Sequence, residues 1–336
     1  MEEQIQKYKG IHPGVVIEQE YIKRNMSQRE LAAKIGVHFQ TLNAVINGRR
    51  KLTLELAYKL EKEFGCEEGF LAVLQTLYDY SEYKRRIEMN NIQVLEIRYE
   101  SGGRTGMIHP VIIRDRDNLI LVDAGLVGQR DILEEAVERI GISFSQLTHI
   151  FITHHDHDHI GSLRVIKEKY PYIKIVSSEV ESPFIDKSEK SPRLIQAESI
   201  YPTLPEELKE GALKFQQFLE SIESVAVDIK VNEGGVLEFL PDVEVIMTPG
   251  HTPGHASLYH KPTKTIIAGD AVVFENGHLD VANPRYTLDM RSALESIRKL
   301  AGYDARRIIC YHGGVFEGDC NKELLRVFDK YRNFVQ

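Results

Sequence analysis

Cysteine is scarce in this sequence of 336 residues, and Cys66, Cys310 and Cys320 lie far apart or in unrelated contexts. So few cysteines exclude a small scaffold held together by disulfides. The sequence also lacks the run of about 18 to 20 apolar residues that a membrane-spanning helix requires. The charged start, MEEQIQKYKG, has no apolar stretch typical of a secretory signal. We therefore expect a cytoplasmic protein with no membrane partner.

The charge of the chain is unevenly distributed. The formal net charge is −8. Residues 1–86 carry 14 Lys and Arg against 12 Asp and Glu, a net +2, and the rest carries 28 against 38, a net −10. A near-neutral to basic N-terminal region followed by an acidic region is typical of a small nucleic-acid-binding module joined to a domain that does not contact nucleic acid.

The residue pattern divides the chain into two regions with different secondary structure. Residues 12–80 are predicted to form short amphipathic helices without strand alternation, and the polar segment 81–91 is predicted to be a linker. From residue 92 to residue 336, apolar strands alternate with helices, which is typical of layered α/β packing. Residues 182–225 are mostly helical and polar, and we interpret them as an insert. We therefore predict a helical domain at 1–80 and an α/β domain at 92–336.

A dense run of metal-binding side chains lies between a buried strand and the start of a helix. Residues 153–161 read THHDHDHIG, and six consecutive side chains in this run can bind a metal. After an extended strand, residues i and i+2 point the same way, so His154 and Asp156 can share one ion. Entry into the helix then redirects Asp158 and His159 toward a second ion.

Three more metal-binding side chains follow short apolar runs in the same half of the chain. They are His251 in TPGHTPGH, Asp270 in IIAGD and His312 in IICYHGG. Each would lie at the same edge of a sheet. Two ions a few ångströms apart require such additional ligands. A histidine that merely fills a core occurs singly, so the whole set favours two divalent metal ions.

In their order and spacing, these motifs closely resemble those of the metallo-β-lactamase superfamily. The family pattern T-H-x-H-x-D-H-x-G falls on residues 153–161, and the resemblance covers about residues 92–336. It implies an α/β fold, the αββα sandwich, with metals at the edge of two sheets. By this resemblance, one metal would be held by His154, Asp156 and His251 and the other by Asp158, His159 and His312, with Asp270 bridging both.

The sequence departs from the family pattern at its second histidine, where Asp156 stands instead. A carboxylate in place of an imidazole makes the first metal site harder and more anionic, which zinc tolerates and which also suits iron or manganese. The iron-dependent flavoprotein branch of the superfamily has an acidic residue there too. We expect zinc, with iron or manganese as alternatives and loss of the first metal as a further one.

Two side chains are expected to support the ligands. Asp123 of LVDAG matches the family aspartate that supports the site from behind. His255, the second histidine of TPGHTPGH, would orient a ligand by a hydrogen bond. An alternative assignment makes His255 the ligand instead of His251, but the family ligand occupies the first position.

The resemblance implies a hydrolase. Two divalent ions lower the pKa of a shared water toward neutrality, so the hydroxide attacks and no separate Ser or Cys nucleophile is required. Asp158 would accept a hydrogen bond from that hydroxide and orient it, which makes it the candidate catalytic residue. The reaction class is hydrolysis of an ester, thioester, lactone, amide or phosphoester bond in a small-molecule substrate.

The substrate itself is less closely defined. The segment TPGHTPGH…SLY resembles that of acyl-homoserine lactonases, which carry a tyrosine three residues beyond the bridging aspartate. Val273 stands at that position here. Tyr286 and Tyr311 are alternatives for this phenol, although a tyrosine near a strand end more often packs in the core. The insert at 182–225 is expected to cap the pocket and to limit substrate size.

Residues 12–70 resemble the Xre/Cro-like helix-turn-helix family, and HPG at 12–14 resembles the start of HigA-type antitoxins. Ser27 and Glu30 predict a capping box at the start of SQRELAAKIG. HFQTLNAVIN matches the recognition helix, which enters the major groove in such modules. The resemblance implies binding of duplex DNA by a homodimer, since one module reads few bases. An alternative is a helical bundle that serves only for dimerisation or docking.

The same resemblance implies which side chains would contact DNA. Those beside phosphates would include Gln28 at the start of the second helix and the basic triplet after the third. Side chains on the recognition helix would face base edges, where glutamine suits adenine. The phosphate contacts would be Gln28, Arg49, Arg50 and Lys51, and the base contacts His38, Gln40, Thr41 and Asn43.

Three functions are compatible with these motifs. The first is a working metallohydrolase whose DNA-binding head gives localisation or self-regulation. The second is a transcription regulator that uses the metal domain as a metabolite or redox sensor with little turnover. The third is a nuclease, but the net −10 of the second region argues against the Lys- and Arg-rich face that a nucleic-acid substrate requires.

Overall fold

A computed structural model describes residue 8 and residues 10–89, 91–101, 104–115, 118–235 and 237–334. The chain divides into two units, Met1–Glu88 and Met89–Gln336. Among the described residues, no helix combines the length and the apolar character needed to cross a membrane.

The described part of the first unit consists of helices around one apolar core. Leu31, Leu42 and Leu60 are fully buried in that core. Ser27 begins the second helix with the predicted capping box, because its hydroxyl accepts from the Glu30 amide while the Glu30 carboxylate accepts from the Ser27 amide. The helices are α2 (Pro13–Lys23), α3 (Gln28–Lys34), α4 (Phe39–Ile46), α5 (Leu54–Phe64) and α6 (Phe70–Met89).

The segment interpreted as a linker is part of a helix. Helix α6 runs without a break from Phe70 to Met89, so residues 81–89 continue the helix that begins in the first unit. The polar composition of this segment is therefore compatible with a continuous helix as well as with an irregular connection. Residue 90 lies outside the described residues.

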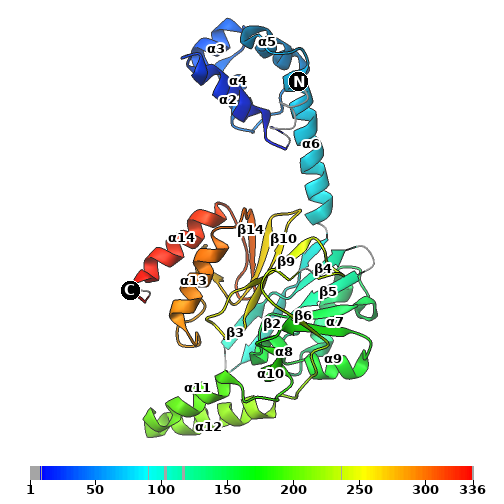
Figure 1. Cartoon of the computed structure of the whole chain (residues 1–336), viewed down its shortest axis with the longest axis vertical. Coiled ribbons are helices and arrows are strands. Elements are labelled where there is room, and N and C mark those ends of the chain that lie inside the picture. The colour runs from blue at the N-terminus through cyan, green and yellow to red at the C-terminus, as the bar shows by residue number, and fades with distance from the viewer. Residues whose placement is uncertain are drawn as a thin grey trace. The chain divides into compact units, whose positions relative to one another are not determined.

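Two sheets form the centre of the second unit (Figure 1). The six-stranded sheet has the order β1 (Ile92–Val94), β4 (Val111–Asp115), β5 (Asn118–Val122), β6 (His149–Ile152), β7 (Lys174–Ser178) and β8 (Ile229–Val231). The five-stranded sheet has the order β15 (Gly314–Glu317), β14 (Arg307–Cys310), β11 (Thr265–Gly269), β10 (Ala256–His260) and β9 (Val243–Met247). Two hairpins accompany them, β2 (Ile97–Ser101) with β3 (Arg104–Ile108) and β12 (Val273–Glu275) with β13 (His278–Asp280).

Helices cover the outer faces of both sheets, which explains why several strands are continuous apolar runs. In β4, Ile113 packs between the sheets, whereas Ile112 packs outward in the same cluster as Leu133 of a covering helix. The predicted αββα sandwich is confirmed. The covering helices are α7 (Arg130–Arg139) and α9 (Leu163–Lys169) on one face and α13 (Met290–Leu300) and α14 (Cys320–Tyr331) on the other. Short 3-10 turns lie at Phe144–Gln146, Tyr201–Thr203 and Arg332–Phe334.

Most of the predicted insert is helical and connects β7 to β8. Its helices are α10 (Ser182–Ile185), α11 (Pro192–Ile200) and α12 (Glu206–Ser221). Helices α11 and α12 pack against each other and extend beyond the sheets (Figure 1).

The carboxyl ends of parallel strands bring predicted metal ligands and the predicted supporting residue Asp123 to one edge of the sandwich. Strands β5 and β6 are parallel, and so are β11 and β14. Asp123 follows β5, His154 lies two residues after β6, Asp270 follows β11 and His312 lies two residues after β14. The strands therefore aim side chains from distant parts of the chain at a common place.

Candidate metal centre and helix-turn-helix surface

The seven predicted metal ligands lie together at this edge. Their ligand atoms form three groups, and within each group the atoms lie within 4.8 Å of one another. The groups are His154, Asp156 and His251; His154, His159 and Asp270; and Asp158, His159 and His312. Up to 158 positions separate these residues in the chain, and the strand ends bring them to one edge as expected.

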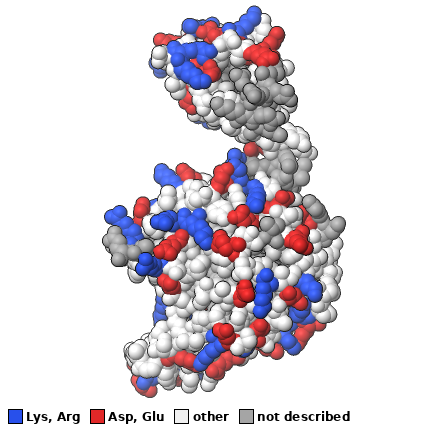
Figure 2. Space-filling model, in the orientation of Figure 1, with Lys and Arg blue, Asp and Glu red and all other residues white. Residues whose placement is uncertain are grey.

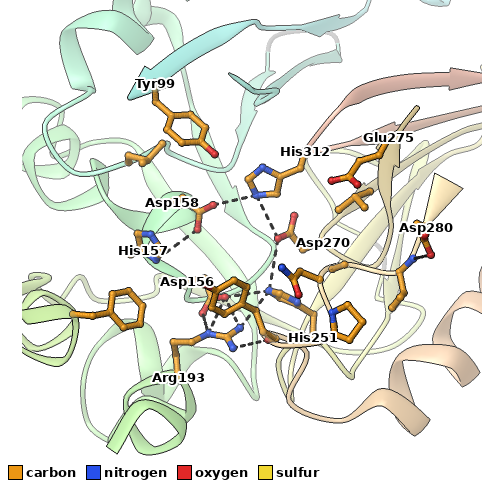
Figure 3. A pocket seen from close by; sticks show the side chains of 18 of the residues that line it. Tyr99, Asp156, His157, Asp158, Arg193, His251, Asp270, Glu275, Asp280 and His312 are labelled. Carbon is orange, nitrogen blue, oxygen red and sulfur yellow. Dashed lines mark hydrogen bonds and ion pairs between the residues drawn. The ribbon is translucent and has the colours of Figure 1, made fainter. Parts of the chain in front are cut away.

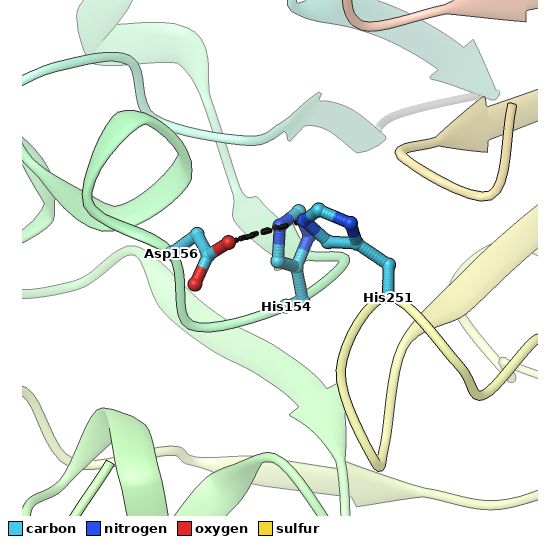
Figure 4. A group of neighbouring side chains, drawn as sticks. All are labelled: His154, Asp156 and His251. Carbon is cyan, nitrogen blue, oxygen red and sulfur yellow. Dashed lines mark hydrogen bonds and ion pairs between the residues drawn. The ribbon is translucent and has the colours of Figure 1, made fainter. Parts of the chain in front are cut away.

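The first group surrounds one carboxylate oxygen (Figure 4). Asp156 Oδ2 lies 3.1 Å from His251 Nε2 and 3.6 Å from His154 Nε2. Asp156 lies just before the short helix α8 (His157–Ile160), and His251 lies in the loop after β9. All three side chains are buried.

Asp270 lies between the first group and the group of Asp158, His159 and His312. His312 Nε2 lies 3.1 Å from Asp158 Oδ2 and 3.6 Å from Asp270 Oδ2. The same Asp270 oxygen lies 3.6 Å from His251 Nε2, and Asp270 Oδ1 lies 3.6 Å from His159 Nε2. Asp270 thus faces both groups, the position that a bridging ligand requires.

The donor atoms suit divalent metals. His154 Nε2, His159 Nε2 and Asp270 Oδ1 are buried and have no hydrogen-bond partner. A buried polar atom without a partner costs about 1–3 kcal/mol, so proteins rarely leave several of them side by side. Imidazole nitrogens and carboxylate oxygens that converge in this way fit zinc, iron or manganese.

The electrostatics of the site also favour a cation. Burial would lower the pKa of His312, but the carboxylates of Asp270 and Asp158 outweigh it and raise that pKa to about 9. Burial would raise the pKa of Asp158, but the neighbouring His159 and His312 hold it well below its usual range. Clustered carboxylates therefore give this edge a negative potential that a divalent ion would neutralise.

The two predicted supporting residues contact ligands by hydrogen bonds. Asp123 accepts from the Thr153 amide at 2.9 Å, and its other oxygen lies 2.9 Å from His159 Nδ1. His255 Nε2 accepts from the Asp270 amide at 3.0 Å. Burial holds the pKa of His255 well below its usual value, which keeps that nitrogen an acceptor. Gly269 makes this contact possible, since a Cβ there would lie 2.7 Å from His255 Nε2.

Glu181 is a supporting residue that the sequence reasoning missed. Its Oε1 accepts from Thr252 Oγ1 at 2.6 Å and from the Gly254 amide at 2.8 Å, while its Oε2 accepts from the His155 amide at 3.0 Å. Oε2 also bonds to His155 Nδ1. One buried carboxylate thereby joins the loop after β6 to the loop of His251. Nothing in the sequence around Glu181 distinguishes it from a surface glutamate.

Arg193 is the second residue that was missed. It lies on α11 of the insert, and it is buried. Its Nε donates to Asp156 Oδ1 at 3.0 Å and its Nη2 to Asp156 Oδ2 at 2.6 Å. Nη1 donates to Gln196 Oε1 and to the Tyr286 carbonyl. Against the opposing effect of burial, this guanidinium helps hold the pKa of Asp156 well below its usual range.

Tyr99 is the third. It lies on β2, pairs with Gly106 of β3, and directs its hydroxyl toward Asp158 and His312 (Figure 3). A Cβ on Gly106 would lie 2.4 Å from Tyr99 Cζ, so the glycine leaves room for the ring across the hairpin. Burial, with Asp158 and Asp270 nearby, raises the pKa of Tyr99 and keeps its hydroxyl protonated.

The two tyrosines considered from the sequence occupy different places. Tyr311 is buried, stacks on His159 with ring centroids 3.9 Å apart, and donates its hydroxyl to the Asp158 carbonyl. Its phenol is therefore used in packing. Tyr286 is partly exposed and lines the cavity described next, whereas Val273 stands where the lactonases have tyrosine.

A cavity of about 770 Å³ opens over the ligands (Figure 3). Asp156, Asp158, His251, Asp270 and His312 all reach its wall. The remaining described lining is mixed, with Leu126, Phe215, Val273, Val281, Ala282, Pro284, Tyr99, Tyr286, Tyr331, Asn283, His157, Glu275, Asp280 and Arg193. The ligands are therefore within reach of a small molecule.

The predicted DNA contacts lie on or beside α4 in the first unit. His38, Gln40, Arg49, Arg50 and Lys51 are exposed, and Gln28, Thr41 and Asn43 are half-buried. Several are already hydrogen-bonded within the unit. Asn43 Nδ2 donates to Gln28 Oε1 at 2.9 Å, Arg49 Nη2 donates to Asn43 Oδ1 at 2.8 Å, and Lys51 Nζ donates to Asp79 Oδ2 at 2.7 Å.

Comparison with known families matches both units. A family model described as the metallo-beta-lactamase superfamily matches residues 103–312, and one described as helix-turn-helix matches residues 17–71. Both predicted resemblances are thereby confirmed.

Curated and solved relatives agree with the first of these matches. The chain is 30% identical over 211 residues to the probable metallo-hydrolase YflN of Bacillus subtilis (strain 168), covering 58% of this chain and 75% of the relative. It is 26% identical to a hydroxyacylglutathione hydrolase of Synechococcus sp., covering 54% and 55%. A metallo-beta-lactamase family protein from Thermus thermophilus has the same fold, with a TM-score of 0.58 at 21% identity over 72% of this chain and 80% of that one.

Proposed function

This chain belongs to the metallo-β-lactamase superfamily, and from that premise we propose that it is a binuclear metallohydrolase of an uncharged ester, thioester or lactone. The observation that carries the proposal is the convergence of seven ligand side chains beneath an open cavity. Two bound divalent cations would supply Lewis acidity and a water of lowered pKa.

The side chains of the chain itself would position the reactants. Asp158 reaches the cavity wall and keeps its charge, so its carboxylate accepts a hydrogen bond from the attacking solvent molecule and orients it. Tyr99 keeps its proton and directs it into the same cavity, where it donates a hydrogen bond to the substrate oxygen on which negative charge develops. Glu181 and Asp123 hold the loops and histidines that define this geometry.

The charges of the lining favour an uncharged substrate. Of the described residues that line the cavity, Arg193 is the only lysine or arginine, and its guanidinium is bonded to Asp156, Gln196 and Tyr286. Glu275 and Asp280 add two carboxylates beyond the proposed ligands. On the face shown in Figure 2, Lys and Arg alternate with Asp and Glu over the second unit, without an extended basic field. These features argue against a nuclease.

The test combines elemental analysis with turnover by the full chain. We expect close to two equivalents of zinc, iron or manganese per chain, and hydrolysis of p-nitrophenyl acetate, thioacetate esters or simple lactones. Asp158→Asn should retain the fold and lose turnover by about 10²-fold or more. Asp329→Asn on exposed α14 is the matched control. Retention of full turnover in Asp158→Asn, or in protein freed of metal, would contradict the proposal.

A second function is supported by the first unit. We propose that it binds duplex DNA, because it matches a helix-turn-helix family and presents exposed polar and basic side chains on and after α4. If the protein is instead a regulator that only senses a ligand, its DNA binding should change when metal or metabolite is added. It should then show no turnover of any of the esters, thioesters or lactones named above.

A further inference from the structure

A second cavity adjoins the metal-site cavity. It has a volume of about 390 Å³ and shares Arg193, Phe215 and Tyr286 with the first. The volume lies in the range of small-molecule sites, about 300–1,000 Å³. The shared residues make the two cavities neighbours along one wall.

The lining of the second cavity comes mainly from one face of each insert helix. On α11 the lining positions are 193, 196, 197 and 200, and on α12 they are 208, 211, 212 and 215. Residues three and four apart lie on the same side of a helix, so each helix turns one stripe toward the cavity. The apolar members are Ala197, Ile200, Leu204, Leu208, Ala212 and Phe215.

Some of these apolar side chains lack the burial that usually accompanies such a stripe. Ile200 is 38% exposed and Leu208 is 53% exposed. Apolar surface left in water is unfavourable by about 25 cal/mol per Å², so an apolar ligand that covers it gains binding free energy. In Figure 2 the concave side of the insert, where it meets the rest of the unit, is mostly neutral.

The lining of the second cavity also has polar members. The guanidinium of Arg193 is directed to Asp156, Gln196 and the Tyr286 carbonyl, so it separates the apolar stripe from the carboxylates of the metal-site cavity. The remaining polar lining comes from Gln196 and Arg285. A molecule that spans both cavities would meet ligands and Tyr99 at one end and aliphatic side chains at the other.

We infer that the substrate is amphipathic, an uncharged ester, thioester or lactone whose apolar acyl chain lies between α11 and α12. This inference rests on the proposed hydrolysis and adds the class of substrate to it. The reaction adds water across the acyl bond, so that the carbonyl carbon gains the oxygen of water and the leaving oxygen or sulfur takes a proton. The acyl chain itself does not react and contributes only binding.

Chain-length dependence tests the inference. Full-length protein would be assayed with p-nitrophenyl esters from acetate to decanoate. Each buried methylene should raise kcat/KM by up to about fourfold until the cavity is filled. A plateau or fall beyond that length is expected because the cavity is finite.

A cavity-filling variant connects this dependence to the second cavity. Gly211 lines the cavity, and a Cβ there would meet nothing within 4 Å. Leucine is also a better helix former than glycine, so Gly211→Leu adds an aliphatic side chain to the lining without straining the helix. The variant should lower kcat/KM for p-nitrophenyl octanoate about tenfold or more and leave kcat/KM for p-nitrophenyl acetate within twofold of the parent value. Lys214→Leu adds the same side chain at an exposed position of α12 that does not line the cavity, and it should leave both substrates unchanged.

A binding measurement separates failure of this inference from failure of the proposed hydrolysis. Calorimetry should show octanamide binding to the full chain more tightly than acetamide, with the difference lost in Gly211→Leu and kept in Lys214→Leu. Equal kcat/KM for acetate and octanoate would overturn the acyl-chain site while leaving hydrolysis intact. If no ester is turned over, tighter binding of octanamide that Gly211→Leu removes still supports the site, and equal binding of both amides overturns it.

Discussion

Asp156 stands where the superfamily pattern has histidine, and a buried arginine accompanies the change. The carboxylate adds a negative charge to the first group of predicted ligands, and Arg193 of the insert neutralises it through three hydrogen bonds. A buried charge without its partner is strongly unfavourable, so each residue of the pair depends on the other. The pair also attaches α11 to a predicted metal ligand.

The pair predicts how stability depends on metal. Arg193→Met leaves the buried Asp156 carboxylate without the guanidinium that neutralises it, so metal-free protein should lose about 3–5 kcal/mol of unfolding free energy. Bound zinc would neutralise the charge of the same carboxylate, so zinc should raise the unfolding temperature of the variant more than that of the parent. Thermal unfolding with chelator and with zinc measures both. In the control Arg193→Met/Asp156→Asn the additional zinc effect should be absent, and an equal zinc effect in all three proteins would refute the argument.

Among the elements, the β2–β3 hairpin places a phenol over the metal ligands. Tyr99 and Gly106 face each other in register, and the ring occupies the space above the glycine. The hairpin thus supplies a group that the lactonase-like position, Val273, does not supply.

This arrangement predicts a non-additive pair of substitutions. Tyr99→Phe should lower kcat for p-nitrophenyl acetate by about 10²-fold, as removal of an oxyanion-stabilising donor does elsewhere. Gly106→Ala should lower it similarly, because its Cβ displaces the ring. The double variant should be no worse than either single one, since both remove the same contact. Tyr286→Phe is the control and should stay near parent activity. Additive losses would show that the two residues act separately.

Helix α13 begins at a cap that also fixes a loop of the cavity. Asp289 accepts from the amides of Arg291 and Ser292, and the preceding residues 282–286 line the two cavities. The hydrogen bonds to Ser292, with those from backbone amides, lower the pKa of Asp289. A lowered pKa in the folded state means that this stabilisation is complete above the unfolded pKa of about 3.9 and is lost as pH falls through the folded value.

The cap therefore predicts a pH-dependent effect. Asp289→Ala should lower the unfolding free energy by about 1 kcal/mol at pH 7, and the difference should shrink below pH 4. Urea denaturation at pH 7 and pH 3 measures it. Asp329→Ala on α14 is the control and should change little at either pH. A difference that grows in acid would contradict the assignment of the cap.

At the scale of the whole molecule, a helix-turn-helix unit and a metallohydrolase unit share one chain. Arg49 and Lys51 already have partners within the first unit, Asn43 and Asp79. Arg50 is exposed between them, which makes it the clearest phosphate contact to test. Its substitution is a way to separate the two functions.

Arg50→Ala should weaken binding of the full chain to duplexes of every sequence, and the slope of log affinity against log salt should fall by about 1. Gln40→Ala should instead weaken one base preference by about 1–3 kcal/mol. Titrations at several salt concentrations measure both, with ester hydrolysis expected to remain unchanged. Sedimentation tests the expected homodimer. No salt-dependent binding by the parent protein would favour the alternative of a docking module.

The sequence by itself determined the two-part organisation, the sandwich and the candidate ligands, because these depend on local signals. Residues 153–161 form a continuous motif in the sequence, and the Ser27–Glu30 capping box spans four residues. Continuous apolar runs likewise indicate which strands are covered on both faces. The linker was the exception, since a polar segment can equally continue a helix, as α6 does.

Only the tertiary structure decided which distant groups support that site. Glu181, Arg193 and Tyr99 stand in ordinary surroundings in the chain, and their roles arise from contacts with distant residues. Glu181 bonds to Thr252, 71 positions away, and Arg193 bonds to the Tyr286 carbonyl, 93 positions away. The cavity between α11 and α12 likewise exists only once the two helix faces meet. Neighbouring residues alone determine a local motif. A contact between remote segments depends on how strands and helices pack, and no single stretch of sequence contains that information.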